Sequence, residues 1–240
     1  MAVDISVTYA IGTAGMALGT LALAVGLRDV ARSHPLRYAS LLGVTGIATV
    51  AYAVMTAGLG TVAVGDRTVF VPRYVDWMLT TPLLILYVGL LAGASRRTIG
   101  LAVGVDTLVL VLGTAATLTT GAVSYALFGA GSVAFLGLLY LLYRPITAAG
   151  RASPDAALFG KLRDVIGVLW LVYPVVWITG PPGLGVMTAE MTALVIVYLD
   201  LVTKVGFGVI VLNARNPMAA GADDADGAAA GTGAGVESAD

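Results

Sequence analysis

The chain has 240 residues, of which 58% are apolar and only 11% are charged, and its mean hydropathy is +0.94. Soluble domains carry about 25% charged residues, because much of their surface must face water. This composition excludes a soluble enzyme, a nucleic-acid-binding protein and a disordered chain, and it predicts an integral membrane protein. The lack of cysteine and the single histidine, His34, exclude disulfides, thiolate catalysis and a cysteine or histidine metal site.

Seven apolar stretches are long enough to cross a bilayer, which needs about 20 helical residues. They cover residues 9–27, 36–59, 71–94, 99–119, 123–143, 162–179 and 188–212. Main-chain groups in lipid must be satisfied internally, and these runs do not alternate as barrel strands would, so each predicts a helix. The segment T-V-A-V-G-D-R-T-V-F at 61–70 predicts a hairpin turning at Gly65-Asp66. The predicted fold is an all-α bundle of seven transmembrane helices, with a short extracellular β-hairpin between helices 2 and 3.

Basic residues gather on one side of the predicted membrane. Ten of the 13 lie there: Arg28, Arg32, Arg37, Arg96, Arg97, Arg144, Arg151, Lys161, Arg163 and Arg215. The positive-inside rule then predicts an extracellular N-terminus and a cytoplasmic C-terminus. Residues 1–216 are expected to form the membrane domain. Residues 217–240 combine Ala and Gly with acids and no basic residue, which predicts a disordered acidic cytoplasmic tail.

Lys204 is the most informative charged residue inside a predicted span. It lies 14 residues after Glu190 and 11 before Arg215, which is about 21 Å and 16 Å along a helix. Its amine therefore cannot reach water by extending its side chain. Asp200 precedes it by four residues and shares its helical face. Ionisable residues at such depth are costly, and they mark functional sites.

A second charged face occurs on the third predicted span. Arg73 and Asp76 are three residues apart, and Thr80 continues the same face. If the two charged faces meet, two cations balance two carboxylates, as burial requires. Two interpretations remain open: an ion-pair network that only fixes helix packing, or a pathway for protons or ions. Asp106 has no evident partner charge, which favours a protonated, hydrogen-bonded contact between helices.

A buried lysine is also the residue type that forms Schiff bases with carbonyl compounds. A protonated Schiff base in an apolar interior needs a counter-carboxylate, which Asp76 and Asp200 could supply. Four aromatic residues could line a slot for a long apolar cofactor: Trp77, Trp170, Tyr173 and Trp177. The last three follow i, i+3, i+7 spacing, which taken alone is more typical of a packed core.

Three motifs resemble the microbial (type 1) rhodopsins, and haloarchaeal sensory rhodopsin II among them. They are R-Y-V-D-W-M-L-T-T-P at 73–82, W-L-V-Y-P-V-V-W at 170–177 and L-D-L-V-T-K-V-G-F-G at 199–208. The resemblance implies all-trans retinal bound covalently to Lys204 as a protonated Schiff base. It makes Asp76 the primary counterion and Asp200 the second, with Arg73 on their extracellular side. The implied pocket residues are Trp77, Thr80, Gly131, Trp170, Tyr173, Trp177 and Thr203.

Within that family, individual positions favour a phototaxis receptor that signals to a membrane-bound transducer. Proton pumps carry a carboxylic donor eleven residues after the counterion, where this chain has Tyr87, and the positions matching their release glutamates are Thr192 and Pro182. Tyr173 and Thr203 match the hydrogen-bonded pair that sensory rhodopsin II uses for signalling. A light-driven proton pump is the alternative, and a seven-helix protein without chromophore is another. No phosphate loop, nucleophile triad or metal cluster supports an enzyme.

The resemblance also implies a partner, a two-helix transmembrane transducer bound through Tyr198 and Thr188. At 100° per residue, Tyr198 lies about 160° from Asp200 on the helical wheel. Its side chain therefore faces lipid or a partner, or else packs against a neighbouring helix. Pro174 is expected to kink the sixth helix. The oligomeric state stays open.

Overall fold

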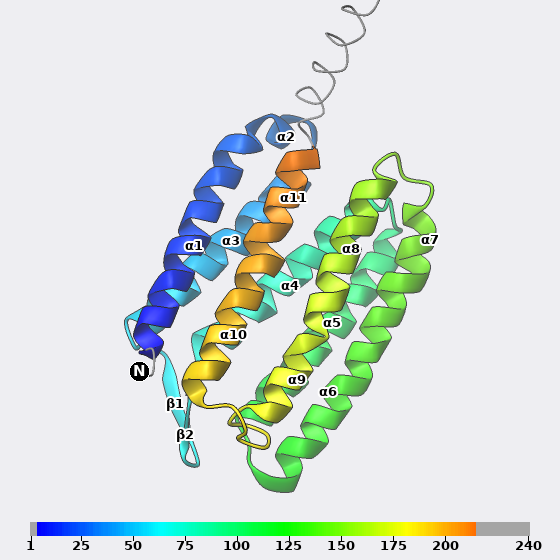
Figure 1. Ribbon diagram of the computed structural model, residues 1–240. Helices are drawn as coiled ribbons and strands as arrows, with labels where there is room; N and C mark the ends of the chain where they lie inside the picture. Colours follow the sequence, from blue (N-terminus) through cyan, green and yellow to red (C-terminus); the bar gives the residue numbers. More distant parts are fainter. Residues whose placement is uncertain (1–3, 215–240) are drawn as a thin grey trace, which may run out of the picture.

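Seven long helices cross the molecule side by side in the computed structural model (Figure 1), which describes residues 4–214 except for the side chains of residues 29 and 30. The first four spans are α1 (Ile5–Gly26), α3 (Pro35–Thr56), α4 (Val71–Leu91) and α5 (Arg96–Thr117). The fifth joins α6 (Gly121–Leu141), η1 (Leu142–Ile146) and α7 (Thr147–Gly150). The sixth joins α8 (Ala156–Trp170) and α9 (Val172–Thr179). The seventh joins α10 (Ala189–Leu201), η2 (Val202–Gly206) and α11 (Phe207–Ala214).

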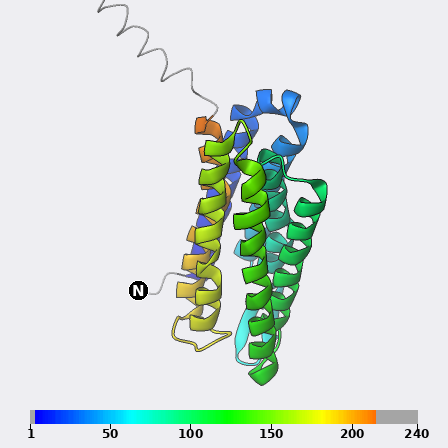
Figure 2. The same ribbon diagram turned by 90° about the vertical axis from the view of Figure 1, so that its right-hand side faces the viewer.

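The helices stand in two rows. In Figure 1, α1, α10–α11, α8–α9 and α6 stand in front of α3, α4 and α5, and Figure 2 shows the two rows edge-on. Helix α1 packs against both α3 and α10, so the first and last spans are neighbours. All seven spans are long and apolar enough to cross a membrane. The chain is therefore a multi-pass membrane protein, and the predicted fold class is confirmed.

Local signals set where several helices begin. The Asp4 carboxylate caps α1 by accepting from the Ser6 N–H at 3.0 Å, and this hydrogen bond lowers the pKa of Asp4. Ser95 caps α5 in the same way, accepting from the Thr98 N–H at 3.1 Å. Pro35 stands at the start of α3, where a missing N–H costs nothing.

The predicted hairpin is present between α3 and α4. Strand β1 (Thr61–Val64) pairs antiparallel with β2 (Arg67–Phe70), and Gly65 in the turn has a φ of 59°, which glycine adopts without strain. Arg67 Nη2 donates to the carbonyl oxygens of Thr117 and Thr119, at 2.8 and 2.6 Å. A cation at the carbonyl end of α5 is favourable, and it fastens the hairpin to that helix.

Several predicted boundaries were wrong at the opposite end of the bundle. The fifth span continues beyond 143 to Gly150, the sixth begins at Ala156 instead of 162, and a short helix, α2 (Arg28–Ser33), follows the first span. Hydropathy detects only the residues in hydrocarbon, whereas a helix can continue through polar residues beyond it. The wide turn of η1 contains Pro145, whose missing N–H breaks the regular α-helical hydrogen bonding.

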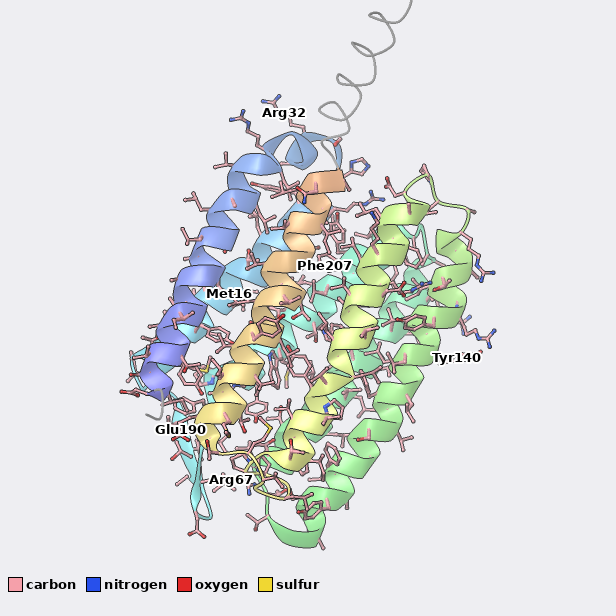
Figure 3. All side chains as sticks on the ribbon, in the orientation of Figure 1. Met16, Arg32, Arg67, Tyr140, Glu190 and Phe207 are labelled. Atoms are coloured by element: carbon pink, nitrogen blue, oxygen red, sulfur yellow. The ribbon has the colours of Figure 1, made fainter. Side chains whose placement is uncertain are left out.

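Two further expectations concern single segments. The sixth span is interrupted at Leu171, three residues before Pro174, which cannot donate to the preceding turn; the kink expected at Pro174 stays a prediction. The predicted tail at 217–240 lies outside the described residues and stays a prediction. Figure 3 shows polar residues at the two ends of the bundle: Arg32 in α2 at one end, and Arg67 in β2 and Glu190 in α10 at the other.

Small residues let α1 approach the seventh span closely. A Cβ atom at Gly15 would lie 2.6 Å from Leu201 Cδ2, and one at Gly19 would lie 2.6 Å from Val205 Cγ2. Both distances are too short for real carbon atoms. The small-residue step on α1 therefore serves packing within the chain.

We expect Gly19→Ala to lower the melting temperature in detergent, because overpacking of a tight contact typically costs about 1–3 kcal/mol. The matched control is Gly100→Ala on α5, where an added Cβ meets nothing within 4 Å. This control should be neutral or slightly stabilising, since Ala favours helix by roughly 0.5–1 kcal/mol. Circular dichroism on heating measures both, and equal melting temperatures for the two variants would contradict the close α1 contact.

Candidate functional site

A cavity of about 620 Å³ lies among the helices at the hairpin half of the bundle, within the size range of small-molecule sites. Its walls come from α1, β2, α4, α5, α6, α8, α9, α10 and η2, together with loop residues near the hairpin. Among the predicted site residues, the cavity is lined by Arg73, Trp77, Gly131, Trp170, Tyr173, Trp177, Asp200, Thr203 and Lys204. Asp76 and Thr80 are buried just behind this wall.

Lys204 is 2% exposed and lies in the wide turn η2. Its Nζ donates to Asp76 Oδ2 and lies 3.7 Å from Asp200 Oδ2. The two charged faces predicted from helical spacing therefore meet inside the bundle. The second oxygen of Asp76, Oδ1, is buried and has no hydrogen-bond partner among the described residues.

Arg73 is the second cation of the predicted charge balance, and it makes no direct ion pair with the two carboxylates. Its guanidinium forms no ion pair with a carboxylate within 4.0 Å in the part of the chain that the structure describes. Instead, Arg73 Nη2 donates to the hydroxyl of Tyr9 on α1 at 2.6 Å. The expected net balance of two cations and two carboxylates holds, but only Lys204 is in direct contact with the carboxylates.

Asp200 accepts hydrogen bonds from three other helices. The hydroxyl groups of Tyr52 on α3 and Tyr173 on α9 donate to it at 2.7 and 2.6 Å. The indole N–H of Trp77 on α4 is 3.1 Å from each of its oxygens. Sequence reasoning missed Tyr52, although a tyrosine deep in an apolar span needs a partner for its hydroxyl, and this could have marked it.

The two predicted threonines bond mainly to the main chain. Thr80 Oγ1 donates to the Asp76 carbonyl oxygen at 2.8 Å, and Thr203 Oγ1 donates to that of Leu199 at 2.8 Å. The Tyr173 hydroxyl donates instead to the Asp200 carboxylate, at 2.6 Å. The hydrogen bond expected between Tyr173 and Thr203 therefore stays a prediction.

Aromatic side chains form much of the cavity wall. The rings of Trp77 and Tyr173 meet edge to face at 5.2 Å, and Trp177 stacks on Phe128 at 4.1 Å. Trp170 is 7% exposed. The stripe on the sixth span therefore lines a cavity in addition to packing the core. Phe128 was missed, because its role depends on the register between α6 and α9.

Gly131 and Asp106 lie where α5 meets its neighbours. A Cβ at Gly131 would lie 3.4 Å from Leu112 Cβ, so α5 and α6 are close at the cavity wall. Asp106 Oδ2 accepts from Thr81 Oγ1 at 2.6 Å, which confirms the predicted contact between helices. Both Asp106 and Thr81 also line the cavity, which the sequence did not indicate.

The two predicted partner-binding residues lie on the surface. Tyr198 is 65% exposed, so it points out of the bundle, as the helical wheel indicates, and does not pack inside it. Thr188 is exposed and caps α10, its hydroxyl accepting from the Met191 N–H at 3.3 Å. Neither side chain belongs to the cavity.

The site fits a long apolar molecule with one reactive carbonyl group. Its amine is buried beside two carboxylates, one of which has an unpartnered oxygen, and its walls are aromatic. An amine in such surroundings can form a Schiff base, and the adjacent carboxylates can balance the charge of a protonated one. Among the described residues, no group of His, Asp and Glu could hold a metal ion.

Comparisons with known proteins agree with this chemistry. A family model described as bacteriorhodopsin-like protein matches residues 4–218. Sensory rhodopsin-2 of Natronomonas pharaonis is 47% identical over 88% of this chain and 90% of its own length. Sensory rhodopsin-2 of Haloarcula vallismortis is 44% identical over 92% and 95%. The crystal structure of a cyanorhodopsin from Calothrix superposes with a TM-score of 0.84 at 30% identity, covering 88% of this chain and 95% of that one. The chain belongs to the bacteriorhodopsin-like family, the microbial rhodopsins, whose members carry a retinal chromophore.

Proposed function

We propose that this protein is a phototaxis photoreceptor of the sensory rhodopsin II kind, which signals light to a transducer in the same membrane. The observation that carries the proposal is the contact between Lys204 Nζ and Asp76 Oδ2 on the wall of an aromatic cavity. The identity to sensory rhodopsins of two organisms, 47% and 44%, supports the receptor role.

In this proposal Lys204 carries all-trans retinal as a protonated Schiff base. Retinal supplies absorption of visible light and a change of shape on isomerisation. The aromatic walls formed by Trp77, Trp170, Tyr173 and Trp177 exclude water and confine the polyene. Asp76 is the primary counterion, because it contacts the Lys204 nitrogen directly, and it can accept a proton from that atom. Asp200 remains a fixed anion, because three hydrogen-bond donors stabilise its charge.

The surroundings of Tyr87 favour the receptor over the proton pump. Tyr87 is 1% exposed, and its ring meets that of Phe207 edge to face at 5.5 Å. Tyr87 belongs to a buried hydrophobic cluster together with Leu84, Val88 and Phe207. Because Tyr87 stands where proton pumps carry a carboxylic donor, a proton that returns to Lys204 from this end meets no carboxylic donor at that position. Thr192 and Pro182, at the other end, also lack the carboxylates of a release group.

The proposal includes an orientation in the cell membrane. Arg28, Arg32, Arg96, Arg97 and Arg151 are exposed at the α2 end of the bundle. By the positive-inside rule this end is cytoplasmic, and the hairpin and N-terminus are extracellular. The transducer would then respond to movements of the α8 end on the cytoplasmic side.

Signal transfer is proposed to run through the sixth and seventh spans. Tyr173 links α9 to Asp200, and the sixth span is interrupted at Leu171 just before it. Isomerisation beside Tyr173 would strain this contact and tilt α8 about the interruption. Exposed Tyr198 and Thr188 on the seventh span would hold a two-helix transmembrane transducer, with lipid around both proteins.

Lys204→Ala should abolish covalent binding of retinal and the visible absorption band. The control is Lys161→Ala, which removes the only other lysine, an exposed residue at the start of the sixth span. This control should form a normal pigment when retinal is added. Absorption spectra of the two purified variants test this prediction. A normal pigment from Lys204→Ala would refute the Schiff-base assignment.

Recovery of the dark state after a flash should be slow and should be accelerated by azide, a mobile proton carrier. Tyr87→Asp should speed recovery by roughly tenfold or more, since it supplies a carboxylic donor on the apolar side. Tyr87→Phe is the control and should leave recovery slow. Fast, azide-insensitive recovery in the unmodified protein, with photocurrents in vesicles under continuous light, would favour the proton pump.

Tyr198→Phe should weaken binding of a transducer transmembrane fragment by about 1 kcal/mol, or roughly fivefold in Kd, because one hydrogen bond in lipid is lost. The visible spectrum should not change. Tyr140→Phe is the control, because Tyr140 is 64% exposed on α6 and points outward elsewhere (Figure 3). Calorimetry in detergent compares the affinities of the two variants for the fragment with that of the unmodified protein. An unchanged affinity of Tyr198→Phe would place the Tyr198 hydroxyl outside the interface.

A further inference from the structure

Arg73 is a buried cation whose partner is unusual. The residue is 8% exposed; Asp76 follows it by three residues on α4, and Asp200 lines the same cavity as Arg73. Both ion pairs of those carboxylates go to Lys204. Arg73 Nε has no hydrogen-bond partner among the described residues, and its Nη2 donates to the Tyr9 hydroxyl at 2.6 Å. A buried guanidinium would ordinarily pair with a carboxylate, so this position needs an explanation.

Two aromatic neighbours hold the Tyr9 ring in place. It is 0% exposed, its ring meets Phe70 edge to face at 4.9 Å, and it meets Tyr52 edge to face at 6.2 Å. Phe70 immediately precedes α4, the helix that carries Arg73. The guanidinium carbon of Arg73 lies 5.6 Å from the centre of the Tyr9 ring. Packing therefore determines where the Tyr9 hydroxyl lies, and the hydroxyl determines where the guanidinium lies.

The second neighbour of Tyr9 leads to the counterion site. Tyr52 packs on Tyr9 and donates to Asp200 at 2.7 Å. Arg73 and Asp200 are thus each held by a tyrosine, and these two rings are in contact. This arrangement leaves Lys204 as the cation in direct contact with the two carboxylates.

We propose that Tyr9 is a positioning residue, which holds the Arg73 guanidinium back from Asp76 and Asp200 and thereby sets the strength of the counterion. The inference rests on the proposed function, because the counterion acts on a retinal Schiff base at Lys204. Without the Tyr9 hydroxyl, the guanidinium is free to move toward the carboxylates. A nearer cation stabilises ionised Asp76 and weakens the negative field that acts on the Lys204 nitrogen.

Tyr9→Phe should therefore change two spectroscopic quantities. Protonation of Asp76 by acid removes the counterion and moves absorption to longer wavelength. The midpoint of this acid-induced colour change should fall by roughly 0.5 pH unit, the effect of bringing a unit charge about 2 Å nearer at an effective dielectric constant of about 20. Absorption near neutral pH should move to longer wavelength, because the cation partly cancels the counterion.

Other ionisable groups near this site have to be considered in such a titration. They are Tyr9 on α1, Tyr52 on α3, Asp66 in the hairpin turn, Arg67 on β2, Arg73, Tyr74 and Asp76 on α4, Asp106 on α5, Tyr173 on α9, Asp200 on α10 and Lys204 in η2. Only the carboxylates titrate in acid. Repeating the comparison with Asp106→Asn in both proteins removes the contribution of that carboxylate.

A double-mutant cycle separates positioning from packing. The four proteins are the unmodified chain, Tyr9→Phe, Arg73→Gln and the double variant. If Tyr9 acts through Arg73, Tyr9→Phe shifts the midpoint in the unmodified chain and has no further effect in Arg73→Gln. Tyr38→Phe is the control, since it removes a hydroxyl that donates to the Ala24 carbonyl at 3.3 Å on α1, away from the cavity. An unchanged midpoint in Tyr9→Phe, or an equal shift with and without Arg73, would overturn the proposal.

Melting of the same four proteins without retinal gives a second measurement. If Tyr9 and Arg73 are hydrogen-bonded, the decreases in melting temperature of the two single variants should add up to more than the decrease in the double variant. Additive effects would contradict the contact itself. Because this measurement needs no pigment, it separates failure of the inference from failure of the proposed function, which would appear as an unmodified protein that forms no pigment with retinal.

Discussion

The site depends on one constraint, the burial of a lysine ammonium group in the apolar interior of a membrane protein. An isolated charge at this depth is very unfavourable, and pairing with hydrogen-bonded anions makes it tolerable. Lys204 meets this requirement through Asp76 and Asp200. The same pairing would serve a cationic Schiff base, so the groups that make the fold acceptable in lipid also prepare the site for its chromophore.

The second carboxylate ties this pair to the rest of the bundle. Asp200 receives donors from α3, α4 and α9, so its position depends on the packing of four spans. Any tilt of the sixth span must disturb the Tyr173 bond to Asp200. A receptor needs such a link between the chromophore and a movable helix. A pump additionally needs a donor on the far side, where this chain has Tyr87 in an apolar cluster.

Much of the fold could be predicted from the sequence, because hydropathy and helical spacing are local properties. The seven spans, the hairpin at Gly65-Asp66 and the meeting of Lys204 with the two carboxylates followed from such patterns. The helix extensions beyond 143 and before 162 did not, because polar helical residues outside the hydrocarbon layer leave no hydropathy signal. The wide turn at η2 could not be foreseen either, since it contains no proline.

The partners of the site residues were harder to predict than the residues themselves. Tyr52 and Tyr9 are both fully buried, and each donates to or accepts from a charged group on another helix. Which tyrosine meets which charge depends on the rotation and register of whole helices, which spacing within one helix does not report. Arg73 illustrates this: its helical face was evident, but its hydrogen bond to α1 required the packed bundle.

We propose that Lys204 bears the chromophore beside Asp76. The most direct measurement is borohydride reduction of the retinal-reconstituted protein, followed by proteolysis and mass spectrometry to locate the attached retinyl group. We expect a visible absorption band before reduction and a retinyl group on the peptide that contains Lys204. A protein that gains no visible band with retinal, or that carries the retinyl group on Lys161, would contradict it.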